Sequence, residues 1–71
     1  MEQFAIYRSP RDYPDQFVVR RWRLVGNEAV HDAQPLAVVD SLDEARAAVP
    51  LGLVRINRYP EDDPVIVEVW L

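Results

Sequence analysis

The stretch FVVRRWRLV, residues 17–25, decides the fold of this chain. It is rich in β-branched and aromatic residues, which favour a pleated, half-buried strand. Alternation rather than helical periodicity also dominates outside it, and predicts four further strands, over residues 4–8, 36–39, 53–58 and 65–71. The intervening segments 9–15, 26–35 and 59–64 carry proline, glycine, asparagine or aspartate, which favour turns and loops.

One short helix is predicted after the third strand. Ser41-Leu42-Asp43-Glu44 fits the S-x-x-E capping box, in which Ser41 accepts from an early backbone N–H and Glu44 reaches back. Leu42, Ala45 and Val49 then form one apolar stripe, and Pro50 and Gly52 mark the end. Because so short a helix is unstable alone, it must pack on the sheet.

The predicted order is strand, strand, strand, helix, strand, strand. It indicates a single domain over residues 1–71, of the α+β class, with a small, mostly antiparallel sheet and the helix on one face. If the strands on either side of the helix run parallel in the same sheet, their crossover is expected to be right-handed.

The amino-acid composition excludes or disfavours disulfides, metal sites and nucleophilic catalysis. The 71 residues include no cysteine and one histidine, which excludes disulfides and thiolate zinc sites. Nucleophilic catalysis needs a serine, cysteine or threonine beside a base, and the chain offers only Ser9 and Ser41. The single histidine, His31, is expected on the surface. Glu61-Asp62-Asp63 lacks the spacing of a calcium loop. We therefore expect no enzyme, no metal and no cofactor.

The expected location is the cytoplasm. The N-terminus lacks a basic start followed by a long apolar run, so it does not resemble a secretory signal. No apolar stretch approaches the roughly 20 residues needed to span a bilayer, so no membrane association is expected.

Arginines are the most informative polar residues. All eight basic residues are arginine; residues 1–25 carry a local charge of +2 and residues 26–71 a charge of −6. The predicted partner-binding face lies on the first two strands and comprises Arg8, Arg11, Tyr13, Arg20, Arg21, Trp22 and Arg23.

Three interpretations of these arginines stay open. Tryptophan, tyrosine and arginine are the usual anchors of protein interfaces. Arginine beside aromatic residues also suits nucleic acid, which the net charge of −4 disfavours. Alternatively the arginines serve cross-strand pairs, with Glu68 inviting Arg20 or Arg55 as its partner.

The last strand leaves a second choice open. Its odd residues, from Val65 to Leu71, are all apolar and predict a core face. If Ile66 and Trp70 lie outside the core beside Trp22 and Leu24, the sheet has a second apolar patch, which marks a partner or self-association site. Alternatively the helix covers the face that carries Ile66 and Trp70, and the odd face of the strand, from Val65 to Leu71, pairs with another copy of the chain.

The segments DYPDQFVVRRW (12–22) and LDEARAAVPLGLVRINRYPEDDPVIVEVW (42–70) resemble small uncharacterised proteins of tailed phages and prophages. The resemblance covers over half of the chain, and its motifs carry over no active-site residue. It implies a context in which small phage proteins bind and redirect a host machine, such as RNA polymerase or a defence nuclease.

Together these observations predict a non-enzymatic protein-binding regulator, phage-encoded, that acts on a host complex in the host cytoplasm, with RNA polymerase as the first candidate. The alternatives are a nucleic-acid-binding protein that uses the Arg/aromatic strand, and a structural homo-oligomer such as a minor virion part. A homodimer is compatible with each of these functions.

Overall fold

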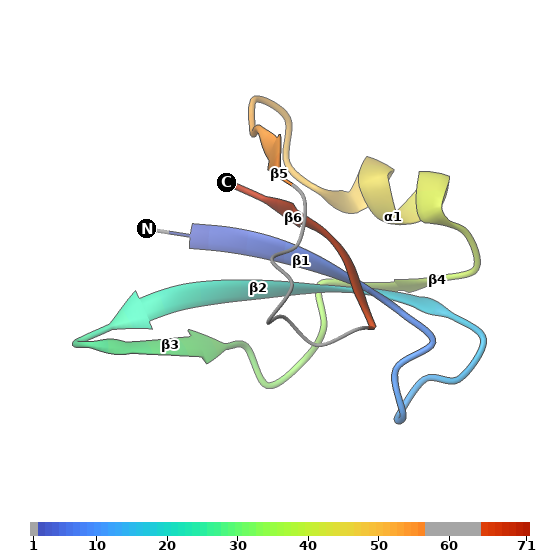
Figure 1. Ribbon diagram of the computed structural model, residues 1–71, viewed down its shortest axis with the longest axis horizontal. Helices are drawn as coiled ribbons and strands as arrows, with labels where there is room; N and C mark the ends of the chain where they lie inside the picture. The colour runs from blue at the N-terminus through green and yellow to red at the C-terminus, as the bar shows by residue number, and fades with distance from the viewer. Residues whose placement is uncertain (1, 57–64) are drawn as a thin grey trace.

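The computed structural model describes residues 2–56 and 65–71 (Figure 1). Within these residues it contains six strands and one helix, which confirms the predicted α+β class. The elements are β1 (Glu2–Arg8), β2 (Phe17–Val25), β3 (Glu28–His31), β4 (Ala37–Val39), α1 (Leu42–Ala48), β5 (Arg55–Ile56) and β6 (Ile66–Trp70).

The sheet is antiparallel and has the order β3-β2-β1-β6-β5, with β4 also paired to β2. The nine residues of β2 hold it together: one edge pairs with all of β1, and the other with β4 near Phe17 and with β3 near Val25. The bounds of β2 are those that the sequence predicts. The prominence of residues 17–25 therefore reflects a strand with three partners.

The expectation of an irregular connection over residues 26–35 is wrong for β3. Glu28–His31 folds back on β2, with Val25 opposite Glu28 and Trp22 opposite His31. Gly26 and Asn27 form the connection, and Gly26 has a φ of 61°. Glycine at the first position of a two-residue loop is typical of a type II′ hairpin. All four residues of β3 are exposed, so apolar alternation did not mark this strand.

The helix joins two strands at opposite edges of the sheet. Because every pairing is antiparallel, β4 and β5 both run parallel to β1, with β2, β1 and β6 between them. Helix α1 lies on one side of the sheet, and the β2–β3 hairpin extends at the end away from it (Figure 1). The helix has seven residues, and the described part of the chain contains no helix long and apolar enough to cross a membrane.

The predicted apolar stripe of α1 is present, together with the Ser41 half of the predicted capping box. Ser41 has extended backbone, and its Oγ accepts a hydrogen bond from the Glu44 N–H at 3.2 Å. The return bond from the Glu44 side chain is absent from the described contacts, so the cap is one-sided. Ala45 and Val49 are buried and Leu42 packs against them. The helix therefore packs on the sheet as its sequence requires.

The core lies between α1 and the near face of the sheet. Phe4 and Ile6 of β1 and Val19 of β2 are buried against Ala45 and Val49. Full burial of a side chain of this size contributes about 1.5–3 kcal/mol, so this small cluster carries much of the stability. Further apolar residues surround it, each partly buried: Phe17, Ala37, Val39, Leu42, Ala48, Leu53, Val67 and Trp70.

The last strand does not follow its predicted alternation. The register of β1 with β6 shifts between Ile6 and Tyr7, so Ile6 faces Glu68 but Tyr7 faces Ile66. Glu68 therefore lies on the helix side of the sheet, and Ile66 on the opposite side. Of the two alternatives left open for this strand, the one in which Ile66 and Trp70 share an apolar patch is wrong, because the register shift separates them.

Strand β5 lies within the expected strand 53–58. Arg55 and Ile56 pair with Trp70 and Val69 of β6, and Val54, just before them, exchanges two backbone hydrogen bonds with Leu71. Residues 57–58 of that prediction, together with the turn 59–64 and its acids Glu61, Asp62 and Asp63, lie outside the described residues.

Candidate interaction site around Trp22

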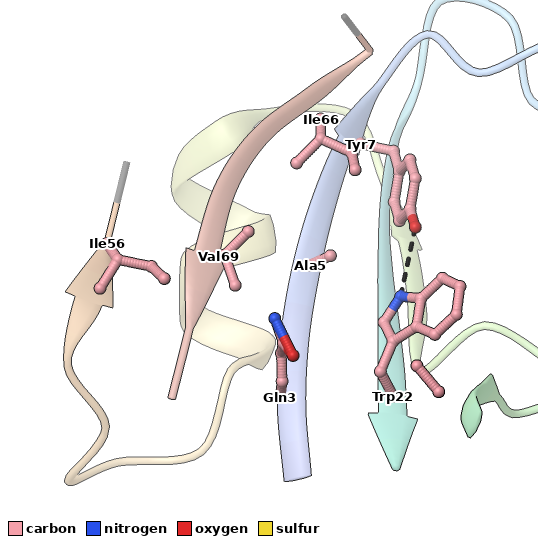
Figure 2. Close-up of a pocket in the computed structure, with 8 residues that line it drawn as sticks. Gln3, Ala5, Tyr7, Trp22, Ile56, Ile66 and Val69 are labelled. Atoms are coloured by element: carbon pink, nitrogen blue, oxygen red, sulfur yellow. Dashed lines mark hydrogen bonds between the residues drawn. The ribbon is translucent and has the colours of Figure 1, made fainter. Parts of the chain in front are cut away.

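The sheet face opposite α1, here called the outer face, gathers side chains from five strands, β1, β2, β3, β5 and β6. Opposite residues in antiparallel strands project to the same side. Ala5 and Arg20 are opposite one another, as are Gln3 and Trp22, and Ala5 also faces Val69. Figure 2 shows Gln3, Ala5, Trp22 and Val69 on this face, with α1 behind the sheet.

Trp22 is held at the centre of this face by two contacts. Its indole Nε1 donates a hydrogen bond to the hydroxyl oxygen of Tyr7 at 3.2 Å (Figure 2). The imidazole of His31, the residue opposite it on β3, meets the indole edge-on at 4.9 Å between ring centroids. An edge-to-face aromatic pair contributes about 0.5–1.5 kcal/mol beyond its buried area. The orientation of Trp22 is therefore fixed from both neighbouring strands.

Beside Trp22 the outer face contains a pocket of about 400 Å³. This volume falls at the lower end of the range for ligand pockets, roughly 300–1,000 Å³. Its floor includes Ala5 and Val69, which are 4% and 6% exposed, while Tyr7 and Trp22 are half-buried. The lining residues are Gln3, Ala5, Tyr7, Trp22, Ala29, Ile56, Ile66 and Val69. The pocket is thus apolar, with few polar groups at its edge.

A more polar hollow adjoins the pocket and shares Tyr7 and Trp22 with it. The Arg20 side chain, which is 16% exposed, places its guanidinium in this hollow, 3.2 Å from the carboxylate of Asp12. Arg11 and His31 also line this hollow. Within the described residues, Arg11 makes no ion pair. Trp22 therefore stands between an apolar pocket and a hollow that carries positive charge.

The predicted arginines of β2 do not form one surface. Arg20 and Trp22 lie on the outer face, whereas Arg21 and Arg23 project to the helix side, as the alternation of the strand requires. Arg21 and Arg23 both pair with Asp32, at 2.8 and 3.2 Å. Arg21 also lies 3.3 Å from Glu2. These guanidinium groups hold neighbouring strands together, as the internal interpretation expects.

The other predicted binding residues lie at or near the loop between β1 and β2. Tyr13 is half-buried, and its N–H donates to the Pro10 carbonyl at 3.0 Å. Arg8 ends β1 and lines a separate small hollow beside Phe17. The loop is tied at its base, where Ser9 Oγ accepts from the Asp15 N–H at 3.0 Å. Arg8 and Arg11 consequently open onto different hollows.

Glu68 has the arginine partner that its buried position requires. Its side chain is 8% exposed. The carboxylate accepts hydrogen bonds from Arg46 of α1, from Arg55 of β5 and from the Trp70 Nε1–H at 3.2 Å. Of the two predicted partners, Arg55 is confirmed and Arg20 is wrong, because Arg20 projects to the outer face toward Asp12.

This network perturbs both partners of its strongest pair. Hydrogen bonds from Arg46 lower the pKa of the Glu68 carboxyl, against the opposing effect of burial, and Trp70 and Arg55 lower it further. The same hydrogen bond raises the pKa of Arg46. Because the network lies on the helix side, it connects α1 to the sheet and takes no part in the Trp22 pocket.

The serines and the histidine make structural contacts. Ser9 and Ser41 both accept backbone N–H groups, and the Nδ1 of His31 lies 2.8 Å from the Asp32 carbonyl. Within residues 2–56 and 65–71, no three histidine, aspartate or glutamate side chains gather where they could hold a metal ion.

Sequence reasoning missed most of the pocket lining. Gln3, Ala5, Ile56 and Val69 come from three strands whose order and register decide that they meet. Two sequence signals pointed to it: the predicted partner-binding face, which contains Trp22, and the second apolar patch, which named Trp22 and Ile66 correctly. That patch also included Leu24 and Trp70, which do not line the pocket.

Comparison of the chain with protein-family models, with curated proteins and with solved structures found no match.

Proposed function

We propose that this protein is a non-enzymatic protein-binding regulator whose contact surface is the Trp22 pocket and the charged hollow beside it. The observation that carries the proposal is the position of Trp22, between an apolar pocket of about 400 Å³ and the arginines Arg11 and Arg20. Tryptophan, tyrosine and arginine around a desolvated pocket are the composition of binding hot spots. The use of both serines in backbone caps supports a role without nucleophilic catalysis.

The chemistry of the site specifies the kind of contact. The pocket suits one apolar side chain of a partner protein, because its floor and most of its walls are hydrocarbon. A carboxylate of the same partner segment would meet Arg11, which has no ion pair in the described part of the chain. An apolar anchor next to an acidic residue is therefore the expected contact.

Protein is favoured over nucleic acid as the partner. Arg20, Arg21 and Arg23 each already pair with a carboxylate of this chain, so phosphate groups would have to compete for them. The net charge of −4 also opposes approach of a polyanion. The arginines that would serve nucleic acid lie on two opposite faces, which prevents one continuous contact.

The biological setting of the proposal follows from the resemblance to small phage proteins. We propose a phage-encoded regulator that acts in the host cytoplasm on a macromolecular complex, with RNA polymerase as the first complex to test. The pocket is compatible with any protein partner that presents an apolar side chain, so the choice of complex rests on the resemblance alone.

Purified host RNA polymerase and a bacterial lysate would serve as two sources of partner for the tagged chain. Two variants address the pocket: Trp22→Ala removes its central side chain, and Gln3→Trp fills it from an exposed position. Arg23→Ala is the matched control, because it neighbours Trp22 in sequence and projects to the other face. Circular dichroism establishes that all three remain folded.

We expect both pocket variants to weaken partner binding by about 30-fold or more, as for a hot-spot residue. Arg23→Ala should change it by less than about threefold. A partner that binds the pocket variants and the original chain equally would contradict the proposed site. Binding of DNA or RNA alone, lost as salt rises, would identify a nucleic-acid protein instead.

A further inference from the structure

The β2–β3 hairpin ends the sheet in a strand that has a partner on one side only. β3 is the terminal strand in the order β3-β2-β1-β6-β5, and all four of its residues are exposed. Leu24 and Val25 are each 58% exposed and Val30 is 40% exposed, so this hairpin carries apolar side chains on both faces. A two-stranded ribbon of this kind is marginally stable by itself.

The hydrogen-bond pattern shows which backbone groups of β3 point outward. The Asp32 N–H donates to the Arg21 carbonyl at 3.2 Å, which makes Arg21 and Asp32 a hydrogen-bonded pair. Such pairs alternate along an antiparallel ladder. Val30 therefore directs its N–H and C=O toward β2, and Ala29 and His31 direct theirs away from the sheet. Among the described contacts, neither Ala29 nor His31 has a backbone partner on that outer side.

Within the described residues, the other two sheet edges have fewer residues assigned to a strand. β5 has two, and β4 has three, preceded by Pro35. Proteins commonly protect an exposed edge with proline, lysine, a bulge or a very short strand. β3 has no proline or lysine and pairs with β2 in regular register. It is therefore the edge of the described sheet that is best suited to accept another strand.

We propose that β3 pairs with β3 of a second copy of this chain, antiparallel and centred on Val30. In this register Ala29 lies opposite His31 of the partner subunit, and His31 opposite Ala29 of the partner subunit. Each such pair exchanges both N–H···O bonds. The strand is thus complementary to itself under a two-fold axis, which is the property of an isologous interface.

The alternatives to this register are weaker for geometric reasons. Moving the centre by half a residue would oppose side chains from different faces, which antiparallel pairing forbids. Centring on Ala29 would leave one such pair inside β3, because each His31 would come opposite Asn27, which belongs to the hairpin turn. Centring on Val30 keeps both pairs inside β3 and places Val30 against Val30 of the partner subunit on the helix side.

The charges tolerate this arrangement. Glu28 would come opposite Asp32 of the partner subunit. Within each chain Asp32 is already held by Arg21 and Arg23, at 2.8 and 3.2 Å, so its negative charge is compensated. Glu28 makes no ion pair in the described part of the chain, and its replacement by glutamine should strengthen the pairing.

The paired molecule would have one continuous sheet through both hairpins. A two-fold axis perpendicular to that sheet leaves both outer faces on the same side. From the usual spacing of strands and residues, the two Trp22 side chains would lie about 16 Å apart. This pairing does not depend on the proposed binding function, and it is tested without any other protein.

Analytical ultracentrifugation of the purified chain over a range of concentrations measures the pairing. Ala29→Pro removes an outward N–H and leaves the ladder between β2 and β3 intact, because proline is tolerated on an edge where its nitrogen faces solvent. Ala29→Thr is the matched control, which keeps the N–H and favours a strand. We expect a dimer for the original chain and for Ala29→Thr. Ala29→Pro should dissociate it about 10- to 100-fold more readily, since each copy loses one donor.

Amide hydrogen exchange, followed by NMR at low and high protein concentration, supplies a second measurement that needs no variant. Val30 should be protected at both concentrations, because its N–H bonds within the chain. Ala29 and His31 should gain protection only at high concentration, where the dimer forms. A chain that stays monomeric at millimolar concentration overturns the proposal, as does a dimer in which Ala29 and His31 exchange as fast as in the monomer. If Ala29→Pro unfolds, the exchange measurement still decides.

Discussion

Arg46 and Glu68 connect the helix to the sheet through a side-chain pair, in which the Arg46 Nε lies 3.1 Å from Oε1 and 3.0 Å from Oε2 of the Glu68 carboxylate. Arg46 is on α1, which connects β4 to β5, and Glu68 is on β6, 22 residues later. The contact therefore fixes this connecting helix to the sheet. Glu68 is the one buried charged residue in the described part of the chain. Changes to its charge or to its arginine partners should therefore alter the free energy of unfolding.

Replacing Glu68 with glutamine should lower the free energy of unfolding by about 1.5–3 kcal/mol, the usual contribution of hydrogen bonds to a charged group. The glutamine side chain keeps an acceptor for Trp70 and loses the charge that holds Arg46 and Arg55. Urea denaturation at neutral pH measures the change. Asp43→Asn is the control, since Asp43 is 97% exposed and lies 3.9 Å from Arg46. Equal loss in both variants would contradict a special role for Glu68.

The same carboxylate should make stability depend on pH in the acid range. Hydrogen bonds from Arg46 lower the pKa of Glu68 in the folded chain, so on acidification the unfolded chain takes up this proton first. The stabilisation is therefore complete above the ordinary glutamate pKa, about 4.3, and is lost as the pH falls through the lowered folded value. Denaturation of the original chain and Glu68→Gln between about pH 7 and pH 3 tests this. The difference between the two should shrink on acidification; a constant difference would refute the assignment.

The helix cap gives a third prediction. Ser41 Oγ accepts the Glu44 N–H at 3.2 Å, one of the early N–H groups that α1 cannot satisfy internally. Ser41→Ala should lower the free energy of unfolding by about 1 kcal/mol, and Ser41→Asp should retain most of it. Because Glu44 does not return the bond in this structure, Glu44→Ala should cost much less than Ser41→Ala. Thermal and urea denaturation of the three variants would show a different order if the reciprocal cap formed.

The sequence predicts the parts of this fold that depend on local pattern. β2 and the helix, with its Ser41 cap, follow from composition and spacing within a few residues. β3 was not predicted, because an exposed hairpin arm needs no apolar alternation. The only sequence signal for it is the turn pair Gly26 and Asn27.

What the sequence does not predict depends on the register between distant strands. The shift between Ile6 and Tyr7 places Ile66 on the outer face and leaves Trp70 against the helix, and no pattern within residues 65–71 encodes it. The partner of Glu68 is similar: Arg46 belongs to a helix whose place over β6 is a property of the whole fold. The candidate pocket was therefore predictable only at Trp22 and Ile66.

The connection between β2 and β3 supplies the last prediction. Gly26 has a φ of 61° and nothing lies within 4 Å of the position that a Cβ would occupy, so a side chain there meets backbone strain without a clash. Gly26→Ala should lower the free energy of unfolding by about 1–2 kcal/mol, and Gly26→Asn by less, because asparagine tolerates positive φ better. The loss should be concentrated in the hairpin: amide exchange at Val30 should accelerate more than at Ile6, which is buried in the core. Equal acceleration at both positions would mean that the hairpin unfolds only together with the whole sheet.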